Sequence, residues 1–426
     1  MTNSNQDMWR ARARQVLPAG GFGNYDPNVV LKAGRGSRVW DEDGKEYIDY
    51  LIGSGPMLVG HNHPEVVEAV QAQLADGMTF FTTNAVGIEL AEVICDAVPC
   101  AEQLRYVSTG SEADMYAMRL ARAHTGRDLI LKFEGGYHGM SGEALMSMAP
   151  QNLANFPQPV PDSAGIPQAT RDGVIVAPFN DIAFARQIIA EYAGQLAGVI
   201  VEPLQRLIPP VPGFLEALRE ETTRHGIVLI FDEVVTGFRL ALGGGQELYG
   251  ITPDLCTLGK VIGGGFPLAA IAGTSEIMAH FDIDKVGQEQ FTFQVGTLSG
   301  NPVAASAGLR TLEILKRDGA YEALRDTGRR LMHSLATTAN QIGLPATVVG
   351  DSVLFDVVFA AGPVADYRDT LRTNADFQKV FNESLRADGI LKAPMKFYAS
   401  LAHDETDLDA TEQAIARAME ACTRLC

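Results

Sequence analysis

A lysine in a glycine-rich turn is the residue in this sequence best suited to covalent chemistry. Lys260 lies in the segment Thr257–Gly265, where two apolar residues and then three consecutive glycines follow it. An amine between an apolar stretch and glycines is poorly placed for a surface charge, and burial lowers the pKa of an amine. An amine with a lowered pKa can form a Schiff base with a carbonyl group. Taken alone, however, Lys260 also fits an ordinary solvated cation.

An aspartate that precedes this lysine helps to decide whether Lys260 forms a Schiff base or is an ordinary solvated cation. Residues 226–231 form a short apolar run opened by glycine, which predicts a fully buried parallel strand, and Asp232 and Glu233 follow at its carboxyl end. Open α/β sheets bind their ligands at that end. A buried carboxylate requires a cation, and a protonated pyridine nitrogen would provide one. The alternative is that Asp232 caps the next helix. Together, Asp232 and Lys260 indicate pyridoxal phosphate.

A third segment has the features of a phosphate site. Residues 108–111 (Ser-Thr-Gly-Ser) lead from a predicted strand at 104–107 into a predicted helix from 112 to 124. Ser111 and Asp114 have the spacing of a capping box, so a well-capped helix explains the segment without a ligand. The free N–H groups and the dipole of a helix start also favour an anion. Both interpretations can hold at once.

The chain resembles the class III pyridoxal-phosphate aminotransferases, and among them most the glutamate-1-semialdehyde aminomutase branch. Five motifs carry the resemblance in the family's order, and the similarity extends from about Val39 to the last predicted helix; the motifs are residues 108–113, 134–139, 231–239, 253–265 and 296–302. The resemblance implies an α/β protein of PLP-dependent transferase fold type I. Such a fold has a large domain with a mostly parallel central sheet and a smaller α+β C-terminal domain. It also implies a homodimer.

The resemblance assigns roles to individual residues. Lys260 and Asp232 would be catalytic, and Gly110 and Ser111 would hold the cofactor phosphate. The remaining cofactor contacts would be Tyr137 stacked on one face of the pyridine ring, Val234 on the other, Glu202 as a structural partner nearby, and Thr297 on the phosphate of the neighbouring subunit's cofactor. Each active site would then need two chains. His138 is expected to orient its loop, and Arg239 to be structural.

The substrate-binding segments depart from the family. Residues 18–27 lack the arginine that aminomutases use for the substrate carboxylate, and residues 389–398 lack the switchable arginine of many class III aminotransferases. Arg206, in contrast, stands where small residues are more usual. Arg206, Lys392 and Lys396 are therefore candidates for a substrate anion site, although the two lysines could equally be plain surface cations.

These residues predict an enzyme that moves an amino group between an amino compound and a keto acid, through a Schiff base at Lys260 and without a metal. An aminomutase of the glutamate-1-semialdehyde type is an alternative, although the missing arginine argues against that substrate. A racemase or epimerase on the same scaffold is another. A cofactor-binding protein without catalysis is a further alternative, which the set Asp232, Lys260 and Tyr137 disfavours.

Composition sets the broad class. The chain has 426 residues and a net charge of −18, which disfavours nucleic acid and acidic membrane surfaces as partners. Its five cysteines (Cys95, Cys100, Cys256, Cys422 and Cys426) are odd in number and lack zinc spacing, as expected for reduced thiols. Residues 1–14 contain no apolar core of a signal peptide, and no apolar run is long enough to span a bilayer. We therefore expect a cytoplasmic protein.

The order of patterns along the chain predicts the architecture. Apolar runs at 104–107, 129–133, 174–177, 198–201 and 227–231 alternate with helical patterns, as in a parallel sheet. Residues 39–49 predict a hairpin that turns at Asp43-Gly44, and residues 151–173 a long surface loop beside the active site. The expected domains are 1–55, an N-terminal part of the small domain; 56–310, the cofactor-binding domain; and 311–426, the small C-terminal domain.

Overall fold

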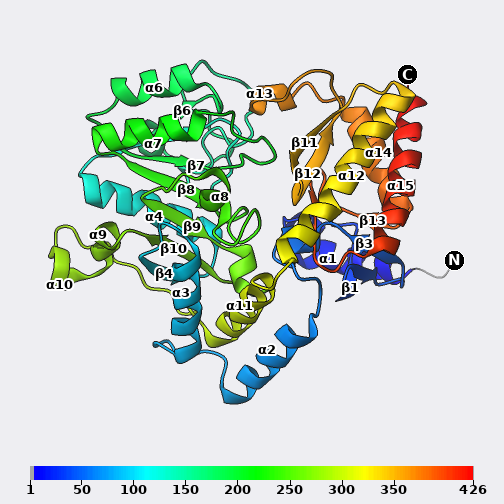
Figure 1. The fold of residues 1–426 in the computed structure, drawn as a ribbon, viewed down its shortest axis with the longest axis horizontal. Coiled ribbons are helices and arrows are strands. Elements are labelled where there is room, and N and C mark those ends of the chain that lie inside the picture. Colours follow the sequence, from blue (N-terminus) through cyan, green and yellow to red (C-terminus); the bar gives the residue numbers. More distant parts are fainter. Residues whose placement is uncertain (1–3, 426) are drawn as a thin grey trace. The chain divides into compact units, whose positions relative to one another are not determined.

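The chain folds into two compact units in the computed structural model, which describes residues 4–425 (Figure 1). The larger unit comprises Glu65–Tyr321 and Pro363–Leu371. The smaller unit comprises the residues up to Pro64, Glu322–Gly362, and the residues from Arg372 onward. The expected boundary at residue 310 falls inside helix α11 (Pro302–Leu315), and nothing in the composition signalled that residues 363–371 belong to the larger unit.

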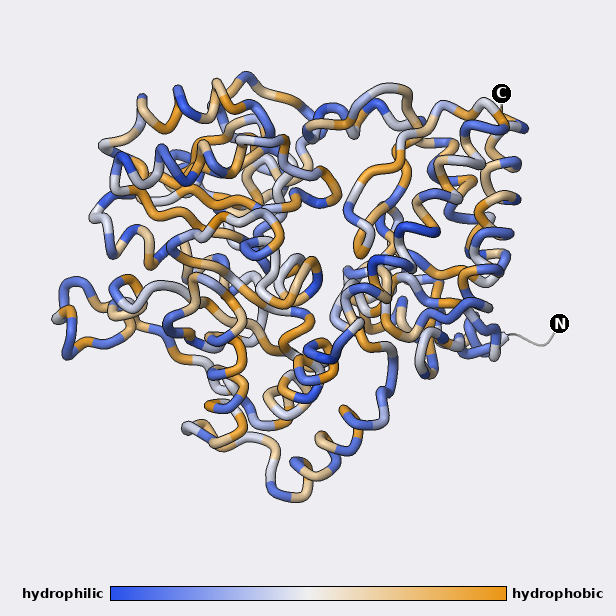
Figure 2. The backbone as a smooth tube through the Cα atoms, viewed as in Figure 1, coloured by the Kyte–Doolittle hydropathy of each residue, from blue (hydrophilic) through white to orange (hydrophobic). Residues whose placement is uncertain are grey.

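A seven-stranded sheet forms the centre of the larger unit, in the order β4-β10-β9-β8-β7-β5-β6. Only the two pairings of β10 are antiparallel. The strands are β4 (Gln103–Val107), β5 (Leu129–Phe133), β6 (Val174–Ala177), β7 (Leu196–Val201), β8 (Val228–Glu233), β9 (Leu255–Leu258) and β10 (Ala269–Gly273). Every residue of β6 to β10 is buried, and Figure 2 shows the hydrophobic course of the central strands. The five predicted strands are confirmed.

Two strands of this sheet were not predicted. Strand β9 reads Leu-Cys-Thr-Leu and β10 Ala-Ala-Ile-Ala-Gly, so each has a single β-branched residue and no aromatic one, a weak strand signal. Both are strands because the sheet supplies paired neighbours on each side. Thr257 pairs directly opposite Asp232 of β8, which places it in the site.

Helices cover both faces of this sheet (Figure 1). Helix α4 (Gly110–Thr125) packs on β7 to β10 and forms a core with Ile200 and Ile230. Side chains alternate along a strand, so Asp232 shares a face with Ile230. On the other face, Phe133 of β5 contacts Phe214 of helix α7 (Phe214–His225), with ring centroids 5.3 Å apart. The other helices of this unit include α3 (Ala85–Ala97), α6 (Ile182–Glu191), α8 (Gly244–Tyr249), α9 (Ser275–Met278), α10 (Ile283–Val286) and α13 (Tyr367–Thr370).

The predicted loop from 151 to 173 is irregular over most of its length but ends in a short helix. Helix α5 (Gln168–Asp172) closes it, and Pro161 forms an isolated bridge with Met146. Helix α2 (Pro64–Asp76) begins at the boundary between the units.

The smaller unit contains two sheets and its own hydrophobic core. One sheet joins β1 (Leu31–Arg35), β2 (Arg38–Asp41), β3 (Glu46–Asp49) and β13 (Ile390–Leu391), and the other β11 (Thr347–Asp351), β12 (Leu354–Val358) and β14 (Phe397–Tyr398). Strands β2 and β3 form the predicted hairpin, with Gly44 at φ 86° in its turn. The long helices are α1 (Asn5–Val16), α12 (Ala320–Ile342), α14 (Ala375–Ala387) and α15 (Glu405–Thr423). Among residues 4–425, no helix combines the length and apolar character needed to cross a bilayer.

Candidate active site

Asp232 lies at the carboxyl end of β8, 4% exposed, among hydrogen-bonding partners from three segments. Its Oδ1 accepts from the backbone N–H of Val234 at 3.0 Å and lies 3.4 Å from the Thr257 hydroxyl. Its Oδ2 lies 2.8 Å from Nδ1 of His138, which is buried. The prediction that Asp232 is buried at the sheet's carboxyl edge is confirmed. This contact gives the buried His138 ring a defined partner. It also holds the Asp232 carboxylate in one orientation.

The start of helix α4 differs from its predicted form. The N-cap is Thr109, and the capping box is formed by Thr109 and Glu112: the Glu112 N–H donates to Thr109 Oγ1, and the Thr109 N–H to Glu112 Oε2. The proposed box between Ser111 and Asp114 is therefore wrong. Asp114 lies one turn further into the helix and faces the sheet, fully buried. The first two amides of the helix, those of Gly110 and Ser111, have no acceptor within the helix, as is general for helix starts.

Glycines allow three segments to converge on Val234. A Cβ at Gly110 would lie 2.9 Å from Val234 Cγ1, and a Cβ at Gly259 would lie 3.2 Å from the same atom. The start of α4, the end of β8 and the residue before Lys260 are thus in close contact. Lys260 itself has φ 48°, a left-handed conformation that is uncommon for a non-glycine residue and worth a functional explanation. Lys260 is partly buried.

The loop after β5 closes another side of the site. A Cβ at Gly139 would lie 2.5 Å from Ser111 Cα, and the Met140 N–H donates to Ser111 Oγ at 3.2 Å, so this loop packs against the helix start. The backbone N–H of Tyr137 donates to Glu202 Oε2 at 2.9 Å. Glu202 therefore fixes the tyrosine's backbone, as expected of a structural partner.

Arg206 lies above Tyr137. Its guanidinium carbon is 5.2 Å from the centroid of the tyrosine ring. Arg206 and Leu207 form a two-residue turn between bridged Gln205 and Ile208, with Arg206 at φ 60°. Within residues 4–425 its guanidinium makes no salt bridge.

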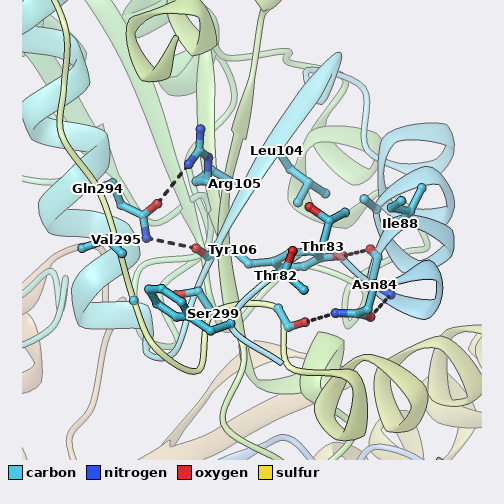
Figure 3. Close-up of a pocket in the computed structure, with 15 residues that line it drawn as sticks. Thr82, Thr83, Asn84, Ile88, Leu104, Arg105, Tyr106, Gln294, Val295 and Ser299 are labelled. Atoms are coloured by element: carbon cyan, nitrogen blue, oxygen red, sulfur yellow. Dashed lines mark hydrogen bonds between the residues drawn. The ribbon is translucent and has the colours of Figure 1, made fainter. Parts of the chain in front are cut away.

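Thr297 is exposed, in a loop of the larger unit. The loop borders a cavity of about 420 Å³ that is lined by residues from 81–91, 104–106 and 294–300 (Figure 3). Asn84 ties this loop down, since its side-chain amide donates to the Gly300 carbonyl at 2.9 Å.

The two lysine candidates for a substrate anion site lie in the smaller unit. Lys392 is 4% exposed, and its Nζ donates to Asp356 Oδ2 at 2.6 Å and to two backbone carbonyls. Neither expectation for Lys392 holds: it is not a surface cation, and its charge is already neutralised by a buried carboxylate. Lys396 is half-buried, with Nζ 6.0 Å from the Tyr398 ring.

Comparison with known proteins agrees with this geometry. Residues 22–418 match the aminotransferase class-III family. The chain belongs to the class III aminotransferases. It is 41% identical over 423 residues to "Glutamate-1-semialdehyde 2,1-aminomutase 2" of Brevibacillus brevis (strain 47 / JCM 6285 / NBRC 100599), covering 96% of this chain and 97% of that protein.

Solved structures show the same similarity. An omega-transaminase from Sphaerobacter thermophilus superposes with a TM-score of 0.93 at 36% identity, covering 99% of this chain and 98% of the other. A transaminase with PLP bound gives 0.90 at 30% identity, covering 100% and 99%. The predicted fold, enzyme class and cofactor are confirmed: this class III aminotransferase has fold type I and uses pyridoxal phosphate.

The residues of the larger unit fit that cofactor. The buried Asp232 carboxylate, held by His138 and the Val234 amide, has the character needed to face a protonated pyridine nitrogen. The glycines at 110 and 139 leave backbone without side chains at the start of α4, where free amides favour a phosphate.

Sequence reasoning missed two site residues, Thr257 and the inward-facing Asp114. Thr257 Oγ1 lies 2.6 Å from Asp114 Oδ1, so the two connect α4 to the carboxylate at the end of β8. One signal was available: Asp114 follows two residues after the capping Glu112, where a second acid is not needed for capping.

Proposed function

We propose that Lys260 and Asp232 carry the transamination chemistry of this enzyme. Support comes from close packing around the Val234 side chain, which contacts both the start of α4 and the residue before Lys260. The residues expected to bind the phosphate, the ring and the aldehyde of the cofactor are therefore neighbours. The single observation that carries the proposal is the buried Asp232, held at one oxygen by His138 and at the other by the Val234 amide.

The bound cofactor supplies an aldehyde that condenses with amines and a ring that accepts electrons from a broken bond. The Lys260 Nζ would hold the cofactor and would carry the proton removed from the substrate carbon. Asp232 would keep the ring nitrogen protonated. The Gly110 and Ser111 amides would hold the phosphate, and Tyr137 and Val234 would contact the ring. Glu202 fixes the backbone of Tyr137.

Borohydride reduction of the cofactor-loaded enzyme tests the covalent role. Peptide mapping should find the label on Lys260, and label on another lysine would contradict the assignment. Lys260→Ala should lower kcat by roughly a thousandfold or more, because it removes a positioned proton carrier as well as the anchor. Lys316→Ala, at an exposed lysine that follows helix α11, is the matched control and should keep its kcat.

We propose further that Arg206 binds the carboxylate of the substrate. Its guanidinium lies over Tyr137, and its turn holds it there in a left-handed conformation. It has no salt bridge within the described chain, and a planar guanidinium is suited to a carboxylate. This would replace the arginine that residues 18–27 lack.

Kinetics with matched substrates test this role. Arg206→Ala should raise KM for an amino acid or keto acid by roughly ten- to a hundredfold, the loss of one charged hydrogen-bonding group, and leave KM for an amine without a carboxylate unchanged. Arg206→Lys should recover part of the loss. Equal effects on both substrates would show that Arg206 only supports Tyr137.

Aminomutase activity is a second candidate, favoured by the 41% identical aminomutase. An aminomutase returns the amino group to the same molecule, whereas an aminotransferase needs an acceptor. We expect turnover to stop when the keto acid is omitted. Turnover of glutamate-1-semialdehyde without an acceptor would establish the aminomutase instead.

We propose that the enzyme is a homodimer in which Thr297 completes the partner's site. Large apolar side chains are exposed in the Thr297 loop and at the nearby cavity: Phe81 (70%), Phe293 (67%), Val295 (58%) and Leu298 (51%). Such a cluster is typical of an interface between proteins. A second copy is the occupant that would also bring Thr297 to a phosphate.

Hybrid dimers test the shared site. The Lys260→Ala and Thr297→Ala proteins should each be poorly active, whereas a mixture refolded together should gain activity, because one site of each hybrid has both residues. No gain from hybrids that form in equal amounts would place Thr297 in its own subunit's site, and a monomeric mass in solution would exclude the dimer.

We also propose a cytoplasmic location, consistent with the free thiols of Cys95, Cys100, Cys256 and Cys422; Cys426 lies outside the described residues.

A further inference from the structure

A second buried carboxylate lies behind Asp232. Asp114, in the second turn of α4, is 2% exposed, and its Oδ1 lies 2.6 Å from the Thr257 hydroxyl. The same hydroxyl lies 3.4 Å from Asp232 Oδ1. Thr257 and Asp232 are paired across β9 and β8. One hydroxyl group thus connects two acids that come from different elements.

The hydrogen atoms of this chain of contacts can be counted. A threonine hydroxyl has one hydrogen to donate, and an ionised carboxylate has none. If both acids were ionised, they would compete for the Thr257 hydrogen. If Asp114 carries a proton, its O–H donates to Thr257 Oγ1, and the Thr257 hydrogen is free for Asp232. The second arrangement lets the Thr257 hydroxyl accept from one acid and donate to the other, so both contacts are hydrogen bonds.

The surroundings of Asp114 favour the proton. Burial is the largest cause that raises its pKa, and the Asp232 charge adds to it. Glu202, after β7, acts in the same direction, whereas the Thr257 hydrogen bond and the Lys260 charge oppose it. Lys132 of β5 and Tyr137 also interact electrostatically with Asp114. The net result is a pKa well above that of an ordinary aspartate.

We propose that Asp114 is a positioning residue that keeps a proton and, through the Thr257 hydroxyl, directs a hydrogen bond onto Asp232. This stabilises the negative charge of Asp232, the group that faces the cofactor's ring nitrogen. The inference rests on the proposed role of Asp232. Asp114 itself does not touch the substrate or the cofactor.

Infrared difference spectroscopy tests the resident proton directly. The carbonyl band of a protonated carboxylic acid should be present in the wild-type enzyme at neutral pH and should be lost in Asp114→Asn. The measurement can be made with and without cofactor, and does not depend on activity. A wild-type spectrum that loses no such band on this substitution would overturn the proposal.

Kinetics and absorbance test the route through Thr257. Thr257→Val should lower kcat by roughly tenfold, the effect of losing one hydrogen bond to a charged group, and leave KM nearly unchanged. In the cofactor-loaded enzyme, Thr257→Val should also shift the titration of the Lys260 Nζ to higher pH. The titration is read from the cofactor's absorbance. The shift is expected because Asp232 then holds less negative charge and the cofactor ring less positive charge. Asp114→Asn should lower kcat less than Thr257→Val does, since the asparagine amide can donate to Thr257 as the acid does.

A matched control separates this role from packing. Thr222→Val removes another buried hydroxyl, which donates to the Leu218 carbonyl in α7, and should change neither kcat nor the titration. If Thr257→Val behaves like this control, the proposal is wrong even though the enzyme is active. If the wild-type enzyme fails to bind cofactor or to carry borohydride label at Lys260, the proposed function fails instead.

Discussion

Each unit of this enzyme buries an aspartate at a strand, and the two aspartates differ in what faces them. Asp356 of the smaller unit accepts a hydrogen bond from the Lys392 ammonium at 2.6 Å. Asp232 of the larger unit faces an imidazole, a backbone amide and a hydroxyl, with a second carboxylate behind them. The charge of Asp356 is compensated by a lysine of the same chain, so this site is closed. The charge of Asp232 is suited to compensation by a cation from a ligand.

The comparison shows why burial alone does not identify a functional acid or base. Burial raises the pKa of Asp356 and lowers the pKa of Lys392, and the pair offsets both effects internally. The rings of Phe381 and Phe397 lie 5.8 and 4.9 Å from the lysine amine and close the pocket around it. A ligand site requires a buried charge whose compensation comes from the ligand.

The largest expected effect is on catalysis at the open site. Asp232→Asn should reduce kcat by roughly a hundredfold or more, as for other losses of a preorganised charge. The urea midpoint should stay equal or rise, because a buried charge is removed. Steady-state kinetics and urea unfolding of one preparation measure both. If Asp232→Asn lowered stability without lowering kcat, the prediction would be wrong, because Asp232 would then behave like the paired Asp356.

The closed site should show the reverse pattern. Asp356→Asn leaves Lys392 buried and unpaired, so unfolding should become easier by about 3–5 kcal/mol. Activity per folded molecule should not change. The double variant Asp356→Leu with Lys392→Met should recover most of the stability, since an apolar pair can replace a buried ion pair. A selective loss of substrate affinity in Lys392→Met would instead show that Lys392 takes part in substrate binding.

A second buried lysine sharpens the comparison through pH. Lys132 of β5 donates to the Ala144 carbonyl at 2.6 Å, and burial lowers its pKa to about 7. Between about pH 7 and the ordinary lysine pKa, the unfolded chain binds more protons than the folded one, so stability should rise with pH across that window, by about 1.4 kcal/mol per pH unit at most. Below pH 7 the cost of burying the charge is fully present.

Urea unfolding of the wild type and Lys132→Met from pH 6.5 to about 9 measures this difference. The wild type should gain stability relative to the variant as the pH rises. A constant difference would mean that Lys132 stays charged in the folded enzyme throughout, as a lysine with a closed ion pair would.

The smallest effect concerns the start of α4. Thr109→Ala removes the observed cap and should cost about 1 kcal/mol of stability. Ser111→Ala should cost less stability, because Ser111 Oγ accepts only from the Met140 amide there. If Ser111→Ala were the more destabilising of the two, the cap would lie where the sequence pattern placed it.

Much of this molecule could be predicted from the sequence because local patterns report burial. Three of the five predicted strands (174–177, 198–201 and 227–231) have no polar side chain, as expected when both faces of a sheet are covered. Strand β10 was missed because alanine and glycine have no strand preference of their own. The capping box was misplaced because Ser111–Asp114 and Thr109–Glu112 have the same spacing, and only the packing of α4 on the sheet turns Asp114 inward.

The sequence by itself determined the cofactor motifs, their order and the strand that presents Asp232, because these depend on residue type and short spacing. Tertiary structure alone decided which buried charges have partners. Lys392 and Asp356 are 36 positions apart, and Asp114 and Thr257 are 143 apart. Such contacts arise when separate strands and helices pack together, so no local pattern can show whether a charge is neutralised within the chain or left for a ligand.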